Sequence, residues 1–252
     1  MAKLKIALQM YTVRDDAKQD FIGTLRKVAD IGYTAVEISA PAGMTAAVLK
    51  KLLDDLGLTP VGTHIPIDAL EKELDKNLDY YGELGVSYIT CPWLPEDRRK
   101  DAAGWKRTAK TLESIGKKIV KGGFTFCYHN HSFEFGRFDG KYGLDILYEE
   151  SDPSFVQSQL DTYWVQHGGE NPADYIRKLS GRVPLVHLKD MLGDGQKTFA
   201  EVGEGILDWD GIFQAAQAAG ADWYIVEQDR CQRPPMESIR ISLNNLKRMG
   251  VA

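Results

Sequence analysis

The chain has 252 residues, 43% of them hydrophobic and 27% charged, and its net charge of −5 argues against a phosphate backbone as its main partner. Its three cysteines are far apart and form no CxxC pair, which argues against a thiolate zinc site and a disulfide framework. The N-terminus lacks the features of a signal peptide, and no apolar stretch reaches the ~20 residues that span a bilayer, so we expect a cytoplasmic protein that binds neither nucleic acid nor membrane.

A unit made of a helix, a glycine and a short apolar run recurs along the chain. A glycine just past a helix can adopt the left-handed conformation that caps it, and a short apolar run with β-branched and aromatic members is typical of a buried parallel strand. Such glycines stand at positions 32, 57, 85, 122–123, 181 and 220. In chain order, the predicted strands are 4–10, 35–38, 59–64, 88–91, 124–128, 155–161, 183–188 and 223–227. Helical spacing of apolar residues is clearest at 21–31, 48–56, 105–120 and 239–249.

Eight strand–helix units in this length predict an α/β protein with a single (β/α)8 TIM barrel over residues 1–252. A doubly wound open sheet is the competitor, but it typically has fewer strands per domain. No linker or change of composition divides the chain. The longest irregular stretch, 190–208, is of a kind that often covers an active site.

Polar side chains follow the predicted strands at their C-terminal ends, where TIM barrels carry their active sites. In strand order they are Gln9 and Tyr11; Glu37; His64; Cys91 and Trp93; His129, His131 and Glu134; Asp161; His187, Lys189 and Asp190; and Glu227 and Asp229. Four of the five histidines are among them. Because acidic groups are seldom buried without a partner, this collection predicts a shared divalent cation with carboxylate and imidazole ligands.

Each of these residues also has a simpler interpretation. Asp161 could cap the following turn, His187 could be a satisfied core histidine, and Glu227 could be a buried salt-bridge partner of Lys189. Trp93 could stack on a sugar face or only pack under a loop. No P-loop, dinucleotide-binding glycine pattern or GxSxG motif is present.

Motifs along nearly the whole chain resemble those of the sugar phosphate isomerase/epimerase family, the xylose isomerase-like TIM barrels. They are LQMYTVR, AVEIS, CYHNHSFEF, QLDTYWV, VHLKD, VGEGILDW and IVEQD. The resemblance implies a divalent metal held by Glu, Asp, His and Glu from strands five to eight. Mn²⁺ is the first expectation, with Co²⁺, Zn²⁺ and Mg²⁺ as alternatives.

Three of these ligands match by position: Asp161, His187 and Glu227. The first ligand differs, because ketose 3-epimerases of the family have a glutamate where this chain has His129. Either His129 replaces that glutamate or Glu134 reaches back from the loop, and the HNHxxE spacing favours Glu134.

The resemblance also implies chemistry beside the carbonyl of a sugar or polyol. Glu227 would remove a proton, and His131, His129 or Glu134 would act on the opposite face, giving an isomerase or epimerase. Substrate-binding residues would be Gln9, Glu37, His64, Trp93 and Lys189. The alternative is a lyase or dehydratase that acts on a keto-inositol or 3-keto-glycoside through the same metal-stabilised enolate.

Two further classes are weaker predictions. Apurinic endonucleases of related fold use a histidine-rich trinuclear zinc site, for which this chain has too few histidines. A non-catalytic carbohydrate-binding protein would bind no metal and exchange no substrate proton. Family members often form homo-oligomers, so self-association is compatible with the resemblance.

Overall fold

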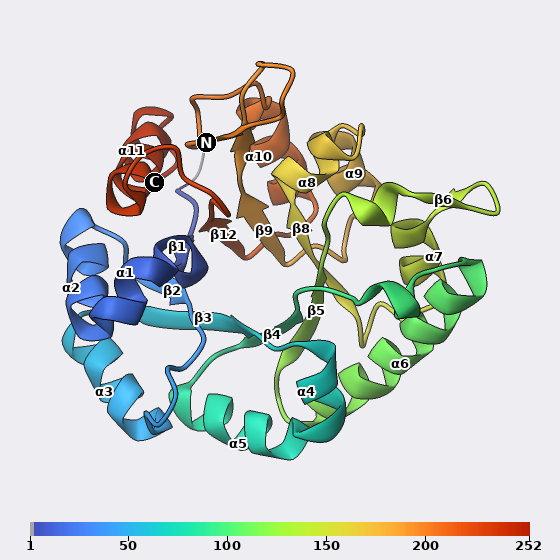
Figure 1. The fold of residues 1–252 in the computed structure, drawn as a ribbon, viewed down its shortest axis with the longest axis horizontal. Coiled ribbons are helices and arrows are strands. Elements are labelled where there is room, and N and C mark those ends of the chain that lie inside the picture. The colour runs from blue at the N-terminus through green and yellow to red at the C-terminus, as the bar shows by residue number, and fades with distance from the viewer. Residues whose placement is uncertain (1–2) are drawn as a thin grey trace.

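Eight parallel strands close into a barrel in the computed structural model, which describes residues 3–252 (Figure 1). The barrel strands are β1 Ile6–Gln9, β2 Ala35–Glu37, β3 Thr59–His64, β4 Tyr88–Cys91, β5 Thr125–His129, β8 Gln157–Asp161, β9 Leu185–Leu188 and β12 Trp223–Val226. The barrel closes because β1 pairs with β2 on one side and with β12 on the other. The predicted (β/α)8 barrel is confirmed, with strand ends displaced by at most two residues.

Helices form a ring outside the strands (Figure 1). They are α1 Arg14–Gln19, α2 Phe21–Ile31, α3 Ala46–Asp55, α4 Ile67–Lys72, α5 Leu74–Leu84, α6 Ala102–Lys121, α7 Gly143–Glu149, α8 Thr162–His167, α9 Pro172–Lys178, α10 Trp209–Ala218 and α11 Pro235–Arg248. Short 3-10 turns lie at Met10–Val13, Glu96–Arg98 and Phe133–Phe135. No helix in residues 3–252 is both long and apolar enough to cross a membrane.

Local sequence sets the ends of these helices. Asp20 accepts a hydrogen bond from the Gly23 N–H at the start of α2, and Gly32 ends the same helix with a φ of 110°. Gly85 ends α5 in the same left-handed conformation, with a φ of 90°. These caps return the chain to the next strand at the places that the glycine pattern predicts.

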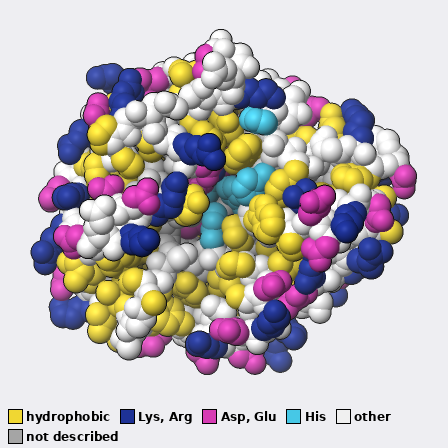
Figure 2. Space-filling model, viewed as in Figure 1, with side chains coloured by type: hydrophobic (Ala, Val, Ile, Leu, Met, Phe, Trp, Pro, Cys, Tyr) yellow, Lys and Arg dark blue, Asp and Glu magenta, His cyan; other side chains and the backbone are white. Residues whose placement is uncertain are grey.

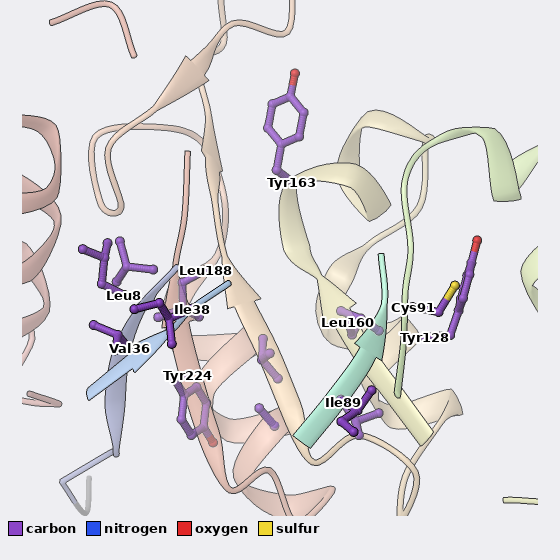
Figure 3. Packing of buried hydrophobic residues seen from close by; sticks show 14 of the residues in the cluster. Leu8, Val36, Ile38, Ile89, Cys91, Tyr128, Leu160, Tyr163, Leu188 and Tyr224 are labelled. Carbon is purple, nitrogen blue, oxygen red and sulfur yellow. The ribbon is translucent and has the colours of Figure 1, made fainter. Parts of the chain in front are cut away.

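Successive side chains of each strand point to opposite faces of the barrel wall and form two separate apolar layers. Residues such as Val36, Ile89, Leu160 and Leu188 lie in the large core between strands and helices (Figure 3). A smaller apolar cluster contains one residue from each of seven barrel strands: Ala7, Ala35, Val61, Tyr88, Cys127, Leu185 and Ile225. Two positions further along, the same strand faces carry Gln9, Glu37, Thr63, Thr90, His129, His187 and Glu227, all of them buried. Because side chains repeat with a period of two, this polar layer lies directly above the apolar cluster.

The stretch after β9 is more ordered than the sequence suggests. It forms a hairpin of β10 Asp190–Met191 and β11 Phe199–Ala200. The buried Asp190 carboxylate accepts hydrogen bonds from four backbone N–H groups and the Trp209 indole; the backbone donors are Met191, Gly203, Gly205 and Leu207. One carboxylate therefore fixes the segment that precedes α10.

Candidate metal centre

Four side chains from successive late strands converge at the C-terminal end of the barrel. They are His129 at the end of β5, Asp161 at the end of β8, His187 in β9 and Glu227 just after β12. One potential ligand atom from each lies within 4.8 Å of the others, and all four residues are buried. A second group, formed by His64, His129 and His187, shares two members but offers no carboxylate.

His187 lies between two carboxylates. Its Nε2 lies 2.8 Å from Glu37 Oε2, and its Nδ1 lies 2.8 Å from Glu227 Oε2. Burial alone would lower the pKa of His187, but the two carboxylates outweigh it and raise the pKa to about 9. The ring is therefore cationic at neutral pH. Since Glu37 holds Nε2, Nδ1 is the nitrogen available to a metal on the Glu227 side.

Glu37 organises the floor of the site. Its carboxylate is fully buried, accepts hydrogen bonds from Gln9 and Gln159 at 2.7 Å each, and lies 3.2 Å from His64 Nε2. Burial would raise the pKa of Glu37, but the His64 and His187 imidazoles hold it below its usual range. Glu37 is thus an anion whose contacts are already filled by neighbouring side chains.

Gln159 links Glu37 to His129. The Gln159 Nε2 donates a hydrogen bond to Glu37, so the Gln159 Oε1 is the acceptor end of the amide. This oxygen lies 3.0 Å from His129 Nδ1 and 2.7 Å from His64 Nε2. His129 therefore carries its proton on Nδ1 and leaves Nε2 unprotonated, 3.5 Å from Asp161 Oδ2. A neutral imidazole with a free Nε2 is the form that binds a metal.

Lys189 brings an ammonium group into the same cluster. Its Nζ lies 2.6 Å from Glu227 Oε2, 2.9 Å from Asp161 Oδ2 and 3.0 Å from Asp229 Oδ2, and only the contact with Asp229 is a well-aligned hydrogen bond. Although burial opposes it, these three carboxylates raise the pKa of Lys189 well above its usual value.

The carboxylates of the site outnumber its cationic side chains. The carboxylates of Glu37, Asp161, Glu227 and Asp229 face the two cations His187 and Lys189. Burial raises the pKa of Asp161 to about 6, with Lys189 and His187 acting in the opposite direction. The excess of carboxylates leaves a net negative charge in the cluster, which favours a bound cation.

Asp161 gives the most direct indication that the donor set fits a metal. Its Oδ1 caps α8 by accepting from the Trp164 N–H at 2.8 Å. Its Oδ2 is buried and has no hydrogen-bond partner within residues 3–252, because the nearby Lys189 ammonium is poorly aligned with it. One oxygen thus has a structural role, while the other is left for an ion at the centre of the cluster.

The simpler interpretations hold alongside the metal interpretation. Asp161 does cap the next helix, both nitrogens of His187 are satisfied, and Glu227 does pair with Lys189. For metal binding, His187 must lose a proton and Lys189 must withdraw from Glu227. A two-imidazole, two-carboxylate set suits Mn²⁺, Zn²⁺ or a similar ion.

A cavity of about 450 Å³, which we call the inner cavity, opens above the cluster. Its lining includes His64, Trp93, His129, His131 and Lys189, together with Glu227, Asp229 and Tyr11. Figure 2 shows histidine side chains at the bottom of a hollow in the middle of this face. The predicted substrate residues His64, Trp93 and Lys189 thus line the cavity.

Gln9 and Glu37 lie below this cavity and do not line it. Their side chains bond to each other, and Glu37 is fully buried. Their predicted role as substrate-binding residues stays a prediction. In the structure, Glu37 contacts the His64 and His187 imidazoles and Gln9 contacts Glu37.

Glu134 is not brought into the metal cluster. Its carboxylate accepts a hydrogen bond from the Tyr128 hydroxyl at 2.6 Å and from the His131 N–H at 2.8 Å. Burial raises the pKa of Glu134 to about 7. The structure therefore groups His129, and not Glu134, with Asp161, His187 and Glu227, while the 3-10 turn after β5 carries Glu134 to Tyr128; the choice of Glu134 as first ligand stays a prediction.

His131 lines the inner cavity beside His129, with ring centroids 5.1 Å apart. Burial, followed by the Lys189 charge, lowers the pKa of His131 to about 3, and burial holds the pKa of His129 well below its usual value. Both rings are therefore neutral at neutral pH: they can accept hydrogen bonds, but burial disfavours their protonation.

Gln159 is the site residue that the sequence analysis missed. It precedes Asp161 by two positions, so the strand period places both side chains on the same face of β8. The alternation in VQSQLD was the available signal, but an uncharged amide did not stand out among acids and histidines.

A family model described as xylose isomerase-like TIM barrel matches residues 25–249. The chain belongs to this family. Inosose dehydratase from Clostridium beijerinckii is 24% identical over 247 residues, which cover 83% of this chain and 82% of that protein.

Solved structures show the same fold. A sugar phosphate isomerase/epimerase from Parabacteroides distasonis has a TM-score of 0.85 and 26% identity, covering 98% of this chain and 94% of that one. IolI protein with a bound zinc atom has a TM-score of 0.76 and 15% identity, covering 97% of each chain, a level that shows the fold alone.

Proposed function

We propose that this protein is an enzyme that binds one divalent metal ion through His129, Asp161, His187 and Glu227 and removes a proton beside the carbonyl of a sugar or cyclic polyol. The observation that carries the proposal is the convergence of these four donors within 4.8 Å beneath an open cavity. When bound, the metal supplies a Lewis acid that stabilises the charge developing on the substrate oxygen.

The side chains of the inner cavity divide the remaining tasks. Glu227 lines the cavity and is an anion, since Lys189 and His187 overcome burial and keep its pKa below its usual range. It can therefore accept the substrate proton. Lys189 lines the same cavity as an ammonium group and can donate hydrogen bonds to a developing oxyanion or a leaving hydroxyl.

Neutral His131 and His129 limit what the opposite face can do. An uncharged imidazole can accept a hydrogen bond from a substrate hydroxyl, but the lowered pKa of both rings disfavours proton transfer to them. Because His129 is proposed as a ligand, His131 is the better partner for that hydroxyl. His64 and Trp93 complete the cavity and would contact the sugar ring.

For the second half of the reaction, we favour loss of a β-hydroxyl, as in a dehydratase. Curated relatives that cover more than four fifths of this chain include inosose dehydratases from Clostridium beijerinckii and Clostridium tetani, which supports this choice. Epimerisation or isomerisation is the second candidate, and the P. distasonis structure at 26% identity supports it. Both outcomes start from the same proton removal.

The test is incubation of Mn²⁺-loaded protein in D2O with an inosose and a panel of ketoses. Deuterium should appear beside the carbonyl with the wild type and not with Glu227→Gln. An unsaturated product would identify the dehydratase, and a deuterated stereoisomer the epimerase. Absence of bound metal together with absence of exchange on every substrate would overturn the proposal.

A further inference from the structure

A second cavity of about 640 Å³, which we call the outer cavity, adjoins the inner one. Tyr11 and Asp229 line both cavities, so the two lie side by side at the mouth of the barrel. The outer cavity is the larger of the two and contains none of the four proposed metal ligands. A substrate that fills both must have a reacting part and a second part.

The walls of the outer cavity carry an excess of positive charge. Arg14, Lys197 and Arg230 line it, and none of them has an acidic partner within 4.0 Å in the described part of the chain. The one carboxylate in the lining, Asp229, is paired with Lys189. Figure 2 shows Lys or Arg side chains on the rim beside the central histidines.

Arg14 is held in place and still has donors to spare. Its guanidinium donates to the carbonyls of Tyr11 at 2.8 Å and Asp229 at 2.9 Å, and it lies 4.1 Å from the centre of the Tyr11 ring. A guanidinium has five N–H donors, so two carbonyls leave others available to a ligand.

Lys197 is fixed in an unfavourable backbone conformation. Its φ is 55°, a left-handed value that in residues 3–252 only one other non-glycine residue, Asp139, shares. Its carbonyl accepts a hydrogen bond from the Tyr163 hydroxyl at 2.6 Å, and its Nζ donates to the His167 carbonyl at 2.7 Å. Glycine would adopt this backbone conformation without strain. What lysine adds at this position is therefore its side chain.

Aromatic rings form the other part of the wall. Tyr163 stacks on Phe199 with ring centroids 3.9 Å apart, and Trp164 stands edge-on to the same phenylalanine. Tyr11 faces solvent with 51% of its surface exposed. These rings provide flat contact area for a ligand, and the three cations provide charge.

We propose that the outer cavity binds the anionic second part of the substrate, a carboxylate or phosphate group joined to the sugar that reacts in the inner cavity. This inference rests on the proposed function for the identity of the reacting part. It adds that the preferred substrates are acidic sugar derivatives and not simple neutral sugars.

The test measures binding of two matched pairs of probes to the metal-loaded full chain by calorimetry. One pair is cellobiose and the aldobiouronic acid in which glucuronic acid is linked to glucose; the other is glucose and glucose 6-phosphate. In at least one pair, the acidic member should bind about tenfold more tightly or better, as expected for charge-assisted hydrogen bonds. The pair that shows the preference identifies carboxylate or phosphate as the natural group.

The variants remove Lys197 and Arg230, two of the three cations of the outer cavity, without touching the metal cluster. Lys197→Met with Arg230→Gln should abolish the preference for the acidic probe and leave the affinity for its neutral partner within about twofold. Lys197→Gly should reduce the preference for the acidic probe without abolishing it. This variant should keep the fold, because glycine suits the left-handed backbone. Lys121→Met, at the end of α6, is the matched control and should keep the preference.

Equal affinities within both pairs would overturn this inference, as would a preference that survives in the double variant. Failure of the proposed function has a different signature, because binding is measured without turnover. The charge preference should persist in Glu227→Gln, in which proton exchange is lost. If the protein prefers the acidic probes but catalyses no proton exchange, the outer cavity is still an anion-binding site. Only the proposed reaction would then be refuted.

Discussion

Glu37 Oε2 lies 2.8 Å from His187 Nε2, and the other nitrogen of the same ring points to Glu227. Through this carboxylate–imidazole contact, Glu37 on the second barrel strand holds His187, the proposed ligand on the seventh. Through Gln159, the same carboxylate also sets the tautomer of His129. Glu37 thus orients both imidazoles of the proposed metal site without belonging to it.

Replacement of Glu37 by Gln should weaken Mn²⁺ or Zn²⁺ binding by about 10- to 100-fold, the usual effect of losing such a partner. The reason is that an amide cannot accept from His187, Gln159 and Gln9 together. Calorimetric titration with each metal measures the effect. Glu201→Gln is the matched control, since Glu201 is also buried but accepts a hydrogen bond from Ser238 and is not part of the metal cluster. Equal metal affinity in the two variants would remove Glu37 from the site.

Lys189→Met should raise metal affinity, by about tenfold, while lowering turnover. The Lys189 ammonium lies within 2.9 Å of two carboxylates that the metal would use, so the ion must displace it toward Asp229. Methionine removes this competing charge and keeps a similar side-chain length. Lys5→Met serves as control, because it breaks an exposed pair with Asp222. Weaker metal binding in Lys189→Met would show that Lys189 supports the ion instead of competing with it.

The fold was readable from sequence because its signals are local. Glycines such as Gly32 and Gly85 end helices in left-handed conformations, and each apolar run that follows is short enough to be a strand. The grouping of Asp161, His187 and Glu227 was also readable, since the C-terminal ends of parallel strands meet at one edge.

The first ligand and the supporting residues were less accessible to sequence reasoning. Glu134 follows β5 in a 3-10 turn, and the direction of that turn depends on a hydrogen bond to Tyr128 that no spacing reveals. Glu37 has the charge of a substrate-binding residue, but its role follows from full burial beneath His187. Such distinctions depend on depth within the barrel, which sequence periodicity does not give.

Glu134 should make the protein less stable as pH rises. Burial raises the pKa of Glu134 from 4.5 to about 7, so between these values the folded protein keeps a proton that the unfolded chain has released. The free energy of unfolding should therefore fall between pH 4.5 and pH 7, by about 3 kcal/mol from this group. Urea unfolding of the wild type and Glu134→Gln at pH 5 and pH 8 measures it. The difference between the two proteins should change by that amount, and a constant difference would contradict the burial argument.

Asp190→Asn should destabilise the protein by about 3 kcal/mol or more, because an amide nitrogen would face N–H donors that the carboxylate now satisfies. On the Oδ2 side these donors are the N–H groups of Gly203, Gly205 and the Trp209 indole. Urea unfolding gives the change, and hydrogen exchange of residues 201–209 shows where order is lost. Asp30→Asn, at an exposed position of α2, should change stability by no more than about 0.5 kcal/mol. Equal small effects in both variants would show that Asp190 does not fix this segment.

Anomalous X-ray diffraction from crystals soaked in Mn²⁺ tests the metal centre most directly, because it locates the ion independently of any substrate. One peak per chain should lie within bonding distance of His129, Asp161, His187 and Glu227, with Lys189 displaced toward Asp229. A peak coordinated by Glu134 without His129, a peak held only by His64, His129 and His187, or no peak in the barrel at saturating Mn²⁺ would contradict the account.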